Sequence, residues 1–320
     1  MAGEKITNGV PYGEKYSKTE KPKGTFYSVV AALRPWSFSA SLVPVALGSM
    51  LAYKDSGYFN VWIFIVTCLT ALSVHGAGNL VNTYFDYMKG VDGSKSDDRT
   101  LVDHILAPND VAQLGAALYT VGCAGFVLLV YLSPAKMEHL ALLYFGGLSG
   151  SFLYTGGLGL KYIALGDIAI FLTFGPVTVM FSFLAQCGKL SLLPLWYAVP
   201  LALNTEAILH CNNTRDMETD KASGIITLAI LIGRTASYLL FVLLLFSPYI
   251  SLFVLALHYS GWFLLPVLSI FPAFSRERDF REGRLRRLPQ KLAQLNIVFG
   301  LSYVLACFLA KGSMLPGMRH

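Results

Sequence analysis

Nine apolar stretches occupy most of the chain after its first 26 residues, and each is about long enough to cross a bilayer. A helix that spans the hydrocarbon core needs about 20 predominantly apolar residues. Hydrophobic residues make up 54% of the 320 residues and charged residues only 14%, whereas a typical soluble domain has about 25% charged residues. We therefore expect an all-α integral membrane protein with about nine transmembrane helices in a bundle. The predicted spans are 28–53, 59–85, 108–133, 136–155, 162–187, 190–213, 224–247, 249–274 and 290–310.

The least certain boundary separates the seventh and eighth spans. The segment "FSPYIS" contains Pro248 between two serines, and a proline removes one backbone donor from a helix. We place a break between two helices there. Other prolines fall inside predicted spans, where neighbouring helices can satisfy the freed carbonyl groups.

The basic residues indicate the topology. An odd number of spans puts the N-terminal segment and every second loop on one side, and 20 of the 25 lysines and arginines fall on that side. The positive-inside rule makes this side cytosolic. Residues 1–26 are polar and lack the apolar core of a signal peptide, so we expect a disordered cytosolic tail. The charge of +6 is explained by these loops, and we expect no nucleic-acid partner.

Two polar segments on the cytosolic side share a pattern. Asn82 and Asp86 form an N-x-x-x-D sequence, and Asn212 and Asp216 repeat it 130 residues later. Each copy ends an apolar span, and each is followed by a Thr-Leu pair. We infer two internally related halves with motifs at 79–92 and 212–220.

The spacing within each motif predicts a polar stripe. Asn79, Asn82 and Asp86 lie three and four residues apart, and so share one helix face. Asn212, Asp216 and Asp220 are each four residues apart and also share one face. If the two stripes face each other, four carboxylates meet, and like charges repel unless a cation lies among them. Oxygen ligands together with a substrate phosphate suit Mg²⁺. The expected metal ligands are Asp86, Asp92, Asp216 and Asp220.

The sequence gives little support for a softer metal. Five cysteines without a CxxC spacing predict neither a disulfide framework nor a zinc site. His75, His104 and His210 are isolated in the sequence, so we expect them to be structural residues.

Basic side chains on the same side could meet a diphosphate. They are Arg99, Lys161, Arg215 and Lys221. Lys161 ends the glycine-rich segment "YTGGLGLKY", which is not a P-loop because tyrosine follows the lysine. A plain tight turn between two spans is the alternative interpretation of this segment.

The two motifs resemble the Asp-rich motifs of the UbiA superfamily of intramembrane prenyltransferases. "NLVNTYFDYMKGVD" is similar to the first and "NNTRDMETDKASG" to the second, and the resemblance covers residues 27–320. It implies a cytosolic cap over a central cavity in the helix bundle. It also implies that Asp86 and Asp216 are catalytic and that the four aspartates bind Mg²⁺. The implied substrate-binding residues are Asn79, Asn82, Arg99, Tyr154, Lys161, Asn212, Arg215 and Lys221.

Two departures from the family pattern concern the phosphate contacts. Thr83 stands where many members have a second aspartate, and Ile225 and Ile226 stand where bacterial relatives often have a Gly-Lys pair. Lys221 is the candidate to replace that lysine.

The resemblance also implies a reaction. The ending Gly90-Val91-Asp92 is similar to that of the menaquinone-forming branch, which implies transfer of geranylgeranyl from its diphosphate to a menadione-type naphthoquinol, forming menaquinone-4 (vitamin K2). Aromatic faces can stabilise an allylic cation, and the candidates are Tyr84, Phe85, Tyr87, Phe152 and Tyr154. No residue identifies itself as the base.

Two other functions stay open at this stage. A transporter is disfavoured because transporter sites lie near the membrane midplane, whereas these carboxylates lie at helix ends. A sensor of prenyl diphosphate or sterol status is the other alternative. The resemblance then implies partners among sterol-synthesis enzymes of the endoplasmic reticulum, such as HMG-CoA reductase. The expected location is the endoplasmic reticulum or Golgi, with a mitochondrial membrane as the alternative.

Overall fold

The computed structural model describes residues 26–92 and 100–318, and the fold in these ranges is helical. Its longer helices are α1 (Phe26–Ala32), α2 (Ser39–Ser56), α3 (Val61–Met88), α4 (Pro108–Leu132), α5 (Met137–Thr155), α6 (Gly166–Leu172), α7 (Thr178–Cys187), α8 (Leu193–Ala222), α9 (Leu228–His258), α10 (Ile270–Arg281) and α11 (Leu288–Leu309). Within the described ranges, extended pairing is limited to one bridge between Ile163 and Ile226. The all-α prediction is confirmed. The tail predicted for residues 1–26 lies, except for Phe26, outside the described residues.

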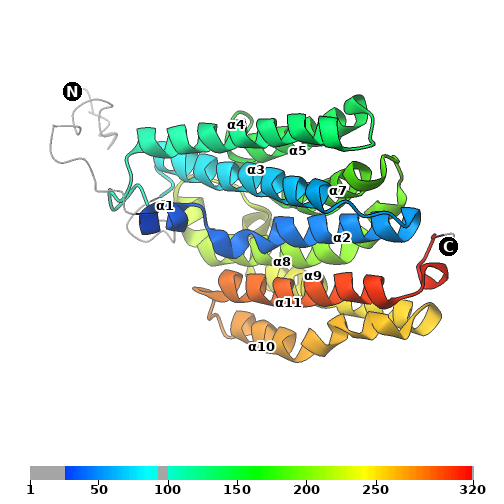
Figure 1. The fold of residues 1–320 in the computed structure, drawn as a ribbon. Coiled ribbons are helices and arrows are strands. Elements are labelled where there is room, and N and C mark those ends of the chain that lie inside the picture. Colours follow the sequence, from blue (N-terminus) through cyan, green and yellow to red (C-terminus); the bar gives the residue numbers. More distant parts are fainter. Residues whose placement is uncertain (1–25, 93–99, 319–320) are drawn as a thin grey trace, which may run out of the picture.

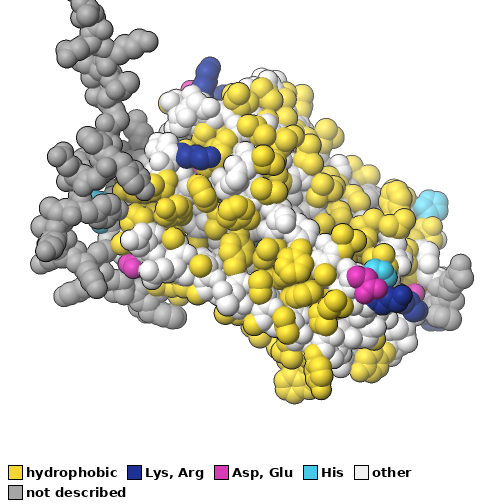
Figure 2. Space-filling model, turned by 90° about the horizontal axis from the view of Figure 1, so that it is seen from above, with side chains coloured by type: hydrophobic (Ala, Val, Ile, Leu, Met, Phe, Trp, Pro, Cys, Tyr) yellow, Lys and Arg dark blue, Asp and Glu magenta, His cyan; other side chains and the backbone are white. Residues whose placement is uncertain are grey.

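The helices are those of a multi-pass membrane protein. Among the described residues, five helical segments are long and apolar enough to cross a membrane: α3, α4, residues 166–187, α9 and α11. The bent pair of 29–37 and α2 raises this number to six. Yellow apolar side chains cover most of the face shown in Figure 2, with few charges among them. The count of nine spans and the cytosolic cap stay predictions.

The bundle is built from neighbouring helices that lie side by side. Helix α3 packs against α4, α2 against α7, and α8 against α9. Figure 1 shows α1 at one end of the bundle and the C-terminal end of α11 at the other. An odd number of membrane crossings would give this arrangement.

The predicted break near Pro248 is wrong. Helix α9 continues through Pro248 to His258, and the chain then passes through η4 (Gly261–Leu264) and η5 (Pro266–Ser269) into α10. Pro248 removes the amide that would donate to the Leu244 carbonyl, and a helix with neighbours on its sides tolerates this loss. The break in α9 lies instead at Gly233, whose φ of 77° is a left-handed conformation that favours glycine.

Helices α2 and α7 approach closely because Gly48 has no side chain. A Cβ atom at Gly48 would lie 2.2 Å from the carbonyl oxygen of Val179. Beside it, the hydroxyl of Ser182 donates to the carbonyl of Val45 at 2.6 Å and lies 2.8 Å from the Ser49 hydroxyl. Small residues permit such close packing in membrane helices, where polar side chains bond across the contact.

The helix between α6 and α7 widens into a π-helical turn, η3 (Thr173–Val177), which contains Pro176. Gly175 in this turn packs directly on Ala202 of α8, where a Cβ would lie 2.4 Å from the Ala202 methyl. Such turns often occur at functional sites. Here Thr173, Phe174 and Val177 line the central cavity.

Candidate active site

A cavity of about 600 Å³ lies between α2, α3, α5, the segment 166–187 and α8. One end is charged, and the other is apolar and aromatic. The charged and amide residues lining it include Asn79, Asn82, Asp86, Asp92, Lys161, Asn212, Arg215, Asp216 and Asp220. The apolar lining includes Ala71, Val74, Leu143, Leu148, Val177 and Phe181. The cavity therefore offers both a site for a polyanion and a space for a hydrocarbon chain.

The first motif lies at the C-terminal end of α3. Asp86 is buried, with 4% of its surface exposed, and each of its oxygens has a donor. Lys161 Nζ lies 2.6 Å from Oδ2, and the Tyr162 hydroxyl donates to Oδ1 at 2.7 Å. Burial, followed by the Asp86 carboxylate, raises the pKa of the Tyr162 phenol, so that Tyr162 keeps its proton and stays a donor.

Asn82 lies one turn before Asp86 and contacts the same lysine. Its Oδ1 accepts from Lys161 Nζ at 3.2 Å and from the Thr155 hydroxyl at 3.3 Å. Asn82 and Asp86 therefore act together on one ammonium group, as their helical spacing predicted.

Asp92 is returned to the cavity by a turn after α3. Gly90 has a φ of 70°, and the amides of Val91 and Asp92 both donate to the Asp86 carbonyl, at 2.8 and 3.3 Å. This turn caps α3 and brings the second carboxylate of the motif back to the cavity wall.

The second motif lies near the end of α8. The Arg215 guanidinium contacts both oxygens of Asp216, with Nε 2.8 Å from Oδ1 and Nη2 2.7 Å from Oδ2. Nη2 also donates to Asn212 Oδ1 at 2.8 Å. Because a guanidinium matches the geometry of a carboxylate or a phosphate, Arg215 can exchange one partner for the other.

Asp220 lies one turn beyond Asp216, past the apolar part of α8. Burial raises the pKa of its carboxyl to about 6; Lys161 and Arg215 oppose this shift, and the charges of Asp216 and Asp86 add to it. A carboxyl in this position ionises readily only when further positive charge is nearby. The site thus favours binding of a cation.

A loop between α5 and α6 joins the two motifs. It contains η2 (Leu160–Tyr162), with Lys161 and Tyr162 directed to Asp86. The backbone amide of Ile226, just after the second motif, donates to the Tyr162 carbonyl at 3.2 Å. The loop therefore contacts Asp86 of the first motif and the segment that follows the second motif, and the alternative of a plain tight turn does not account for these contacts.

Most of the predicted site residues line the one cavity. These are Asn79, Asn82, Asp86, Asp92, Tyr154, Lys161, Asn212, Arg215, Asp216 and Asp220. Lys221 is exposed and is not among the lining residues, and Arg99 lies outside the described residues. The Asn79 amide donates to the Leu33 carbonyl at 2.8 Å and to the Ser37 hydroxyl at 3.2 Å, so it faces the segment between α1 and α2.

Of the five aromatic candidates, Tyr154 lines the cavity and the other four do not. Phe85 and Phe152 pack edge-to-face on each other, with ring centroids 6.5 Å apart. The aromatic lining that the sequence did not predict comprises Trp36, Tyr144, Phe174 and Phe181.

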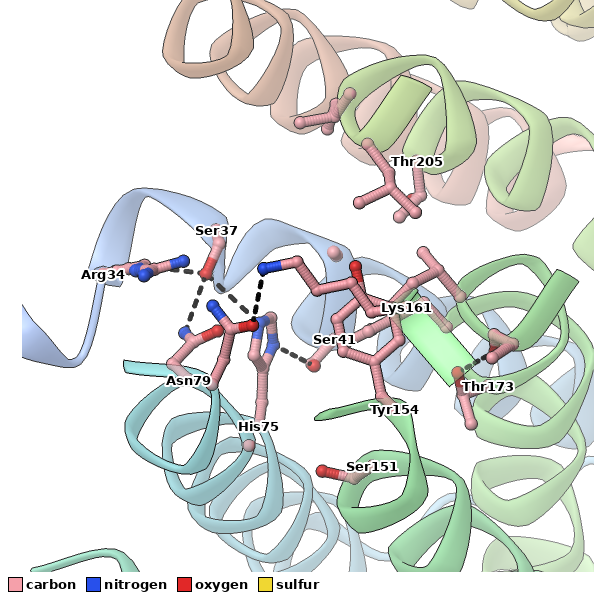
Figure 3. A pocket seen from close by; sticks show the side chains of 18 of the residues that line it. Arg34, Ser37, Ser41, His75, Asn79, Ser151, Tyr154, Lys161, Thr173 and Thr205 are labelled. Atoms are coloured by element: carbon pink, nitrogen blue, oxygen red, sulfur yellow. Dashed lines mark hydrogen bonds between the residues drawn. The ribbon is translucent and has the colours of Figure 1, made fainter. Parts of the chain in front are cut away.

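The sequence did not predict two groups of polar residues that lie at or beside the cavity. Arg34, Ser37, Ser41 and His75 line the cavity (Figure 3). A second group lies beside the cavity, where Asp167 receives the Asn213 amide at 3.4 Å and approaches His210 at 3.5 Å. One signal was available, since His75 precedes Asn79 by four residues and extends the polar stripe of α3 by one turn.

The donor set fits a metal shared with a substrate phosphate. Within residues 26–92 and 100–318, the side chains of His, Cys, Asp and Glu form no ready cluster of three or more ligands, because Lys161 and Arg215 contact two of the carboxylates. Mg²⁺ commonly takes a few carboxylates, several waters and phosphate oxygens. Four carboxylates and two mobile cations around one cavity match that pattern better than an all-protein cage.

Comparison with known proteins finds relatives over most of the chain. The chain matches the UbiA prenyltransferase family over residues 41–299. UbiA prenyltransferase domain-containing protein 1 of Danio rerio is 60% identical over 287 residues, covering 90% of this chain and 85% of the relative. The Homo sapiens protein of that name is 59% identical over 289 residues, covering 90% and 86%. A homolog in Drosophila melanogaster is 57% identical over 303 residues, covering 93% and 84%.

The fold is shared with archaeal members of known structure. The apo structure of a UbiA homolog from Aeropyrum pernix K1 has a TM-score of 0.67 at 17% identity, covering 85% of this chain and 98% of that one. A UbiA homolog from Archaeoglobus fulgidus bound to GPP and Mg²⁺ has a TM-score of 0.60 at 13% identity, covering 87% and 99%. Because the family match covers most of the sequence and the relatives above share more than half of their aligned residues with it, the chain belongs to the UbiA prenyltransferase family.

Proposed function

We propose that the protein transfers a geranylgeranyl group from its diphosphate to a menadione-type naphthoquinol, in a Mg²⁺-dependent reaction that forms menaquinone-4 in its quinol form. The observation that carries this proposal is the cavity itself, which joins a carboxylate and cation cluster to an apolar interior. A prenyl diphosphate has the same two parts. The family assignment and the homolog bound to GPP and Mg²⁺ support the diphosphate half of the proposal.

The four aspartates of the motifs would hold Mg²⁺, and through it the diphosphate. Asp86 and Asp216 would be the central pair, with Asp92 and Asp220 beside them. When bound, the metal neutralises the charge that develops on the leaving diphosphate. Lys161 and Arg215 already lie at Asp86 and Asp216, so both can turn to the phosphate oxygens while a metal takes the carboxylates.

The chemistry requires the C–O bond to the diphosphate to break and leaves a cation-like allylic carbon. Lys161 and Arg215 line this end of the cavity, and positive donors there would stabilise the charge that develops on the leaving diphosphate. The apolar lining excludes water, which would otherwise capture the cation. Phe174, Tyr154 and Trp36 line the cavity wall, and aromatic rings can stabilise a cation.

The acceptor identity rests on the similarity of Gly90-Val91-Asp92 to the menaquinone-forming branch. The membrane assignment agrees with the apolar spans. A cytosolic active site in the endoplasmic reticulum or Golgi is part of the proposal and rests on the distribution of basic residues. A role as a sensor that binds sterol-synthesis enzymes stays an additional prediction.

The test is a transfer assay on the purified full chain. Wild type is incubated with Mg²⁺, geranylgeranyl diphosphate and chemically reduced menadione, and the product is identified by mass. We expect a geranylgeranylated naphthoquinol. Binding of the diphosphate without any prenylated product would overturn the enzymatic proposal and favour the sensor. Shorter prenyl diphosphates and other quinols in the same assay test the specificity.

A further inference from the structure

We propose that Ser41 and His75 form the subsite for the hydroxyl of the aromatic acceptor, with Ser41 passing the acceptor proton to His75. This inference rests on the proposed function, since it assigns the acceptor half of the same reaction. It concerns residues from α2 and the middle of α3, apart from the two aspartate motifs.

The His75 ring is held on both edges by hydroxyl groups. Ser41 Oγ lies 2.6 Å from Nδ1, and Ser37 Oγ lies 3.1 Å from Nε2 (Figure 3). The ring also packs between Phe38 and Phe174, with centroid distances of 5.3 and 4.6 Å. His75 is 7% exposed and Ser41 is 3% exposed, yet both line the cavity.

The hydrogen-bond network assigns the tautomer of His75. Ser37 has one hydroxyl proton, which it donates to the Arg34 carbonyl at 2.8 Å. Its oxygen accepts from the Asn79 amide at 3.2 Å, and we assign its other lone pair to a hydrogen bond from His75 Nε2–H, 3.1 Å away. His75 Nδ1 is then unprotonated, and Ser41 donates to it.

This tautomer makes Ser41 a proton relay. A serine whose proton already points to a basic nitrogen can accept a proton from a third group and pass its own proton on. The Ser41 oxygen keeps its lone pairs for a donor in the cavity. A phenolic hydroxyl of the acceptor is such a donor.

The separation of His75 from Asp86 along α3 leaves room for an acceptor between His75 and the diphosphate. His75 and Asp86 are 11 residues apart, which is about 16 Å at the helical rise of 1.5 Å per residue. Asn79 and Asn82 lie between them on the same face. In the proposed reaction the diphosphate lies at the Asp86 end, so the aromatic ring of the acceptor would occupy the part of the cavity between Asp86 and His75.

The step can be written with its atoms balanced. As the allylic C–O bond breaks, its electron pair leaves with the diphosphate, and a ring π pair forms the new C–C bond. The acceptor hydroxyl gives its proton to Ser41 Oγ, while Ser41 gives its own proton to His75 Nδ1. The ring-carbon hydrogen then leaves as a proton to the released diphosphate, and the acceptor oxygen recovers its proton along the same path.

The experiment compares three variants of the full chain in the transfer assay. Ser41→Ala removes the relay hydroxyl. His75→Gln keeps an acceptor for Ser41 but cannot take up a proton. Ser49→Ala is the matched control, because Ser49 is also a buried serine of α2, bonded to Ser182 and not among the cavity-lining residues.

We expect Ser41→Ala and His75→Gln to lower kcat/KM for the naphthoquinol about 100-fold or more, as loss of an acid–base group does. The Mg²⁺-dependent affinity for geranylgeranyl thiodiphosphate should stay unchanged in both, and Ser49→Ala should resemble wild type. A monomethyl ether of the acceptor, blocked next to the reacting carbon, should react poorly with wild type. With Ser41→Ala, kcat/KM for the ether and for the diol should differ much less than with wild type.

If replacing the diol by the ether lowered kcat/KM by the same factor in wild type and in Ser41→Ala, the relay would be overturned. Turnover of the naphthoquinol by Ser41→Ala at the wild-type rate would also overturn it. A loss of thiodiphosphate affinity matching the loss of turnover would show a structural role and would also overturn it. If wild type itself forms no prenylated quinol, the proposed function fails instead.

Discussion

The ammonium nitrogen of Lys161 lies 2.6 Å from Oδ2 of Asp86, and the side chains are only 15% and 5% exposed. The two residues come from different segments, a loop after α5 and the end of α3. In an ion pair this well shielded from water, removing either partner leaves the other charge buried and uncompensated. The lysine therefore holds the carboxylate in place, and in the proposed reaction a metal and a diphosphate would replace this contact.

Replacing Lys161 with methionine should disable the site. We expect kcat/KM for the prenyl diphosphate to fall about 100- to 1,000-fold, as when one preorganised charge donor is removed. The matched control is Lys189→Met, because Lys189 also pairs with an aspartate, Asp55 at 2.8 Å, but is 61% exposed. The control should keep wild-type kinetics, and an equal loss in both variants would show a general effect on folding.

Tyr162→Phe tests the second donor to Asp86. The hydroxyl lies 2.7 Å from Oδ1, and a hydrogen bond to a charged group contributes about 1.5–3 kcal/mol. We expect diphosphate affinity, measured by titration calorimetry, to weaken by roughly 10-fold or more. Unchanged affinity would mean that this hydroxyl leaves Asp86 when the substrate binds.

Stabilisation of the protein by Mg²⁺ should grow with pH. The pKa of Asp220 is raised to about 6 in the folded protein, so without metal the folded state holds a proton that the unfolded state releases, and stability falls as pH rises from about 4 to 6. Above this range the ionised carboxylate can bind Mg²⁺. The increase in Tm on adding Mg²⁺ should therefore be larger at pH 7 than at pH 5.

Asp220→Asn provides the control for this pH dependence. The amide does not titrate, so its Mg²⁺-induced Tm shift should vary less between pH 5 and 7. An identical Tm shift for wild type at both values would contradict the assignment of Asp220 to the metal site.

Gly48→Ala should destabilise the contact between α2 and α7. The added methyl would meet the backbone oxygen of Val179 at 2.2 Å, and overpacking of this kind costs about 1–3 kcal/mol. Gly146→Ala is the matched control, since Gly146 is also inside a helix, α5, but has no atom within 4 Å of the new Cβ. We expect a lower Tm for the first variant and an equal or higher Tm for the second.

The charged half of the site could be predicted from the sequence because it follows a helical repeat. Asn82 and Asp86, like Asn212 and Asp216, lie one turn apart, and this spacing alone places each pair on one face. Lys161 could be selected because it ends a glycine-rich loop on the same side as both motifs. Its contact with Asp86 depends on how α3 and α5 pack, which local spacing does not encode.

The other half of the cavity could not be predicted in the same way. Ser37 and Ser41 are common residues in an apolar segment, and their contact with His75 depends on the bend between residues 29–37 and α2. The boundary of α9 was misplaced for a related reason. A proline favours a break, but α9 continues through Pro248, and the left-handed Gly233 carries the break instead.

The central claim is that two motifs 130 residues apart form one Mg²⁺–diphosphate site. A double-mutant cycle tests it most directly, with Asp86→Asn, Asp216→Asn and the double variant, and with Mg²⁺-dependent affinity for geranylgeranyl thiodiphosphate as the measurement. We predict that each single variant loses most of the Mg²⁺-dependent affinity and that the double variant is little weaker than either, because residues sharing one ligand are not additive. Strictly additive losses, or a single variant with wild-type affinity, would contradict a shared site.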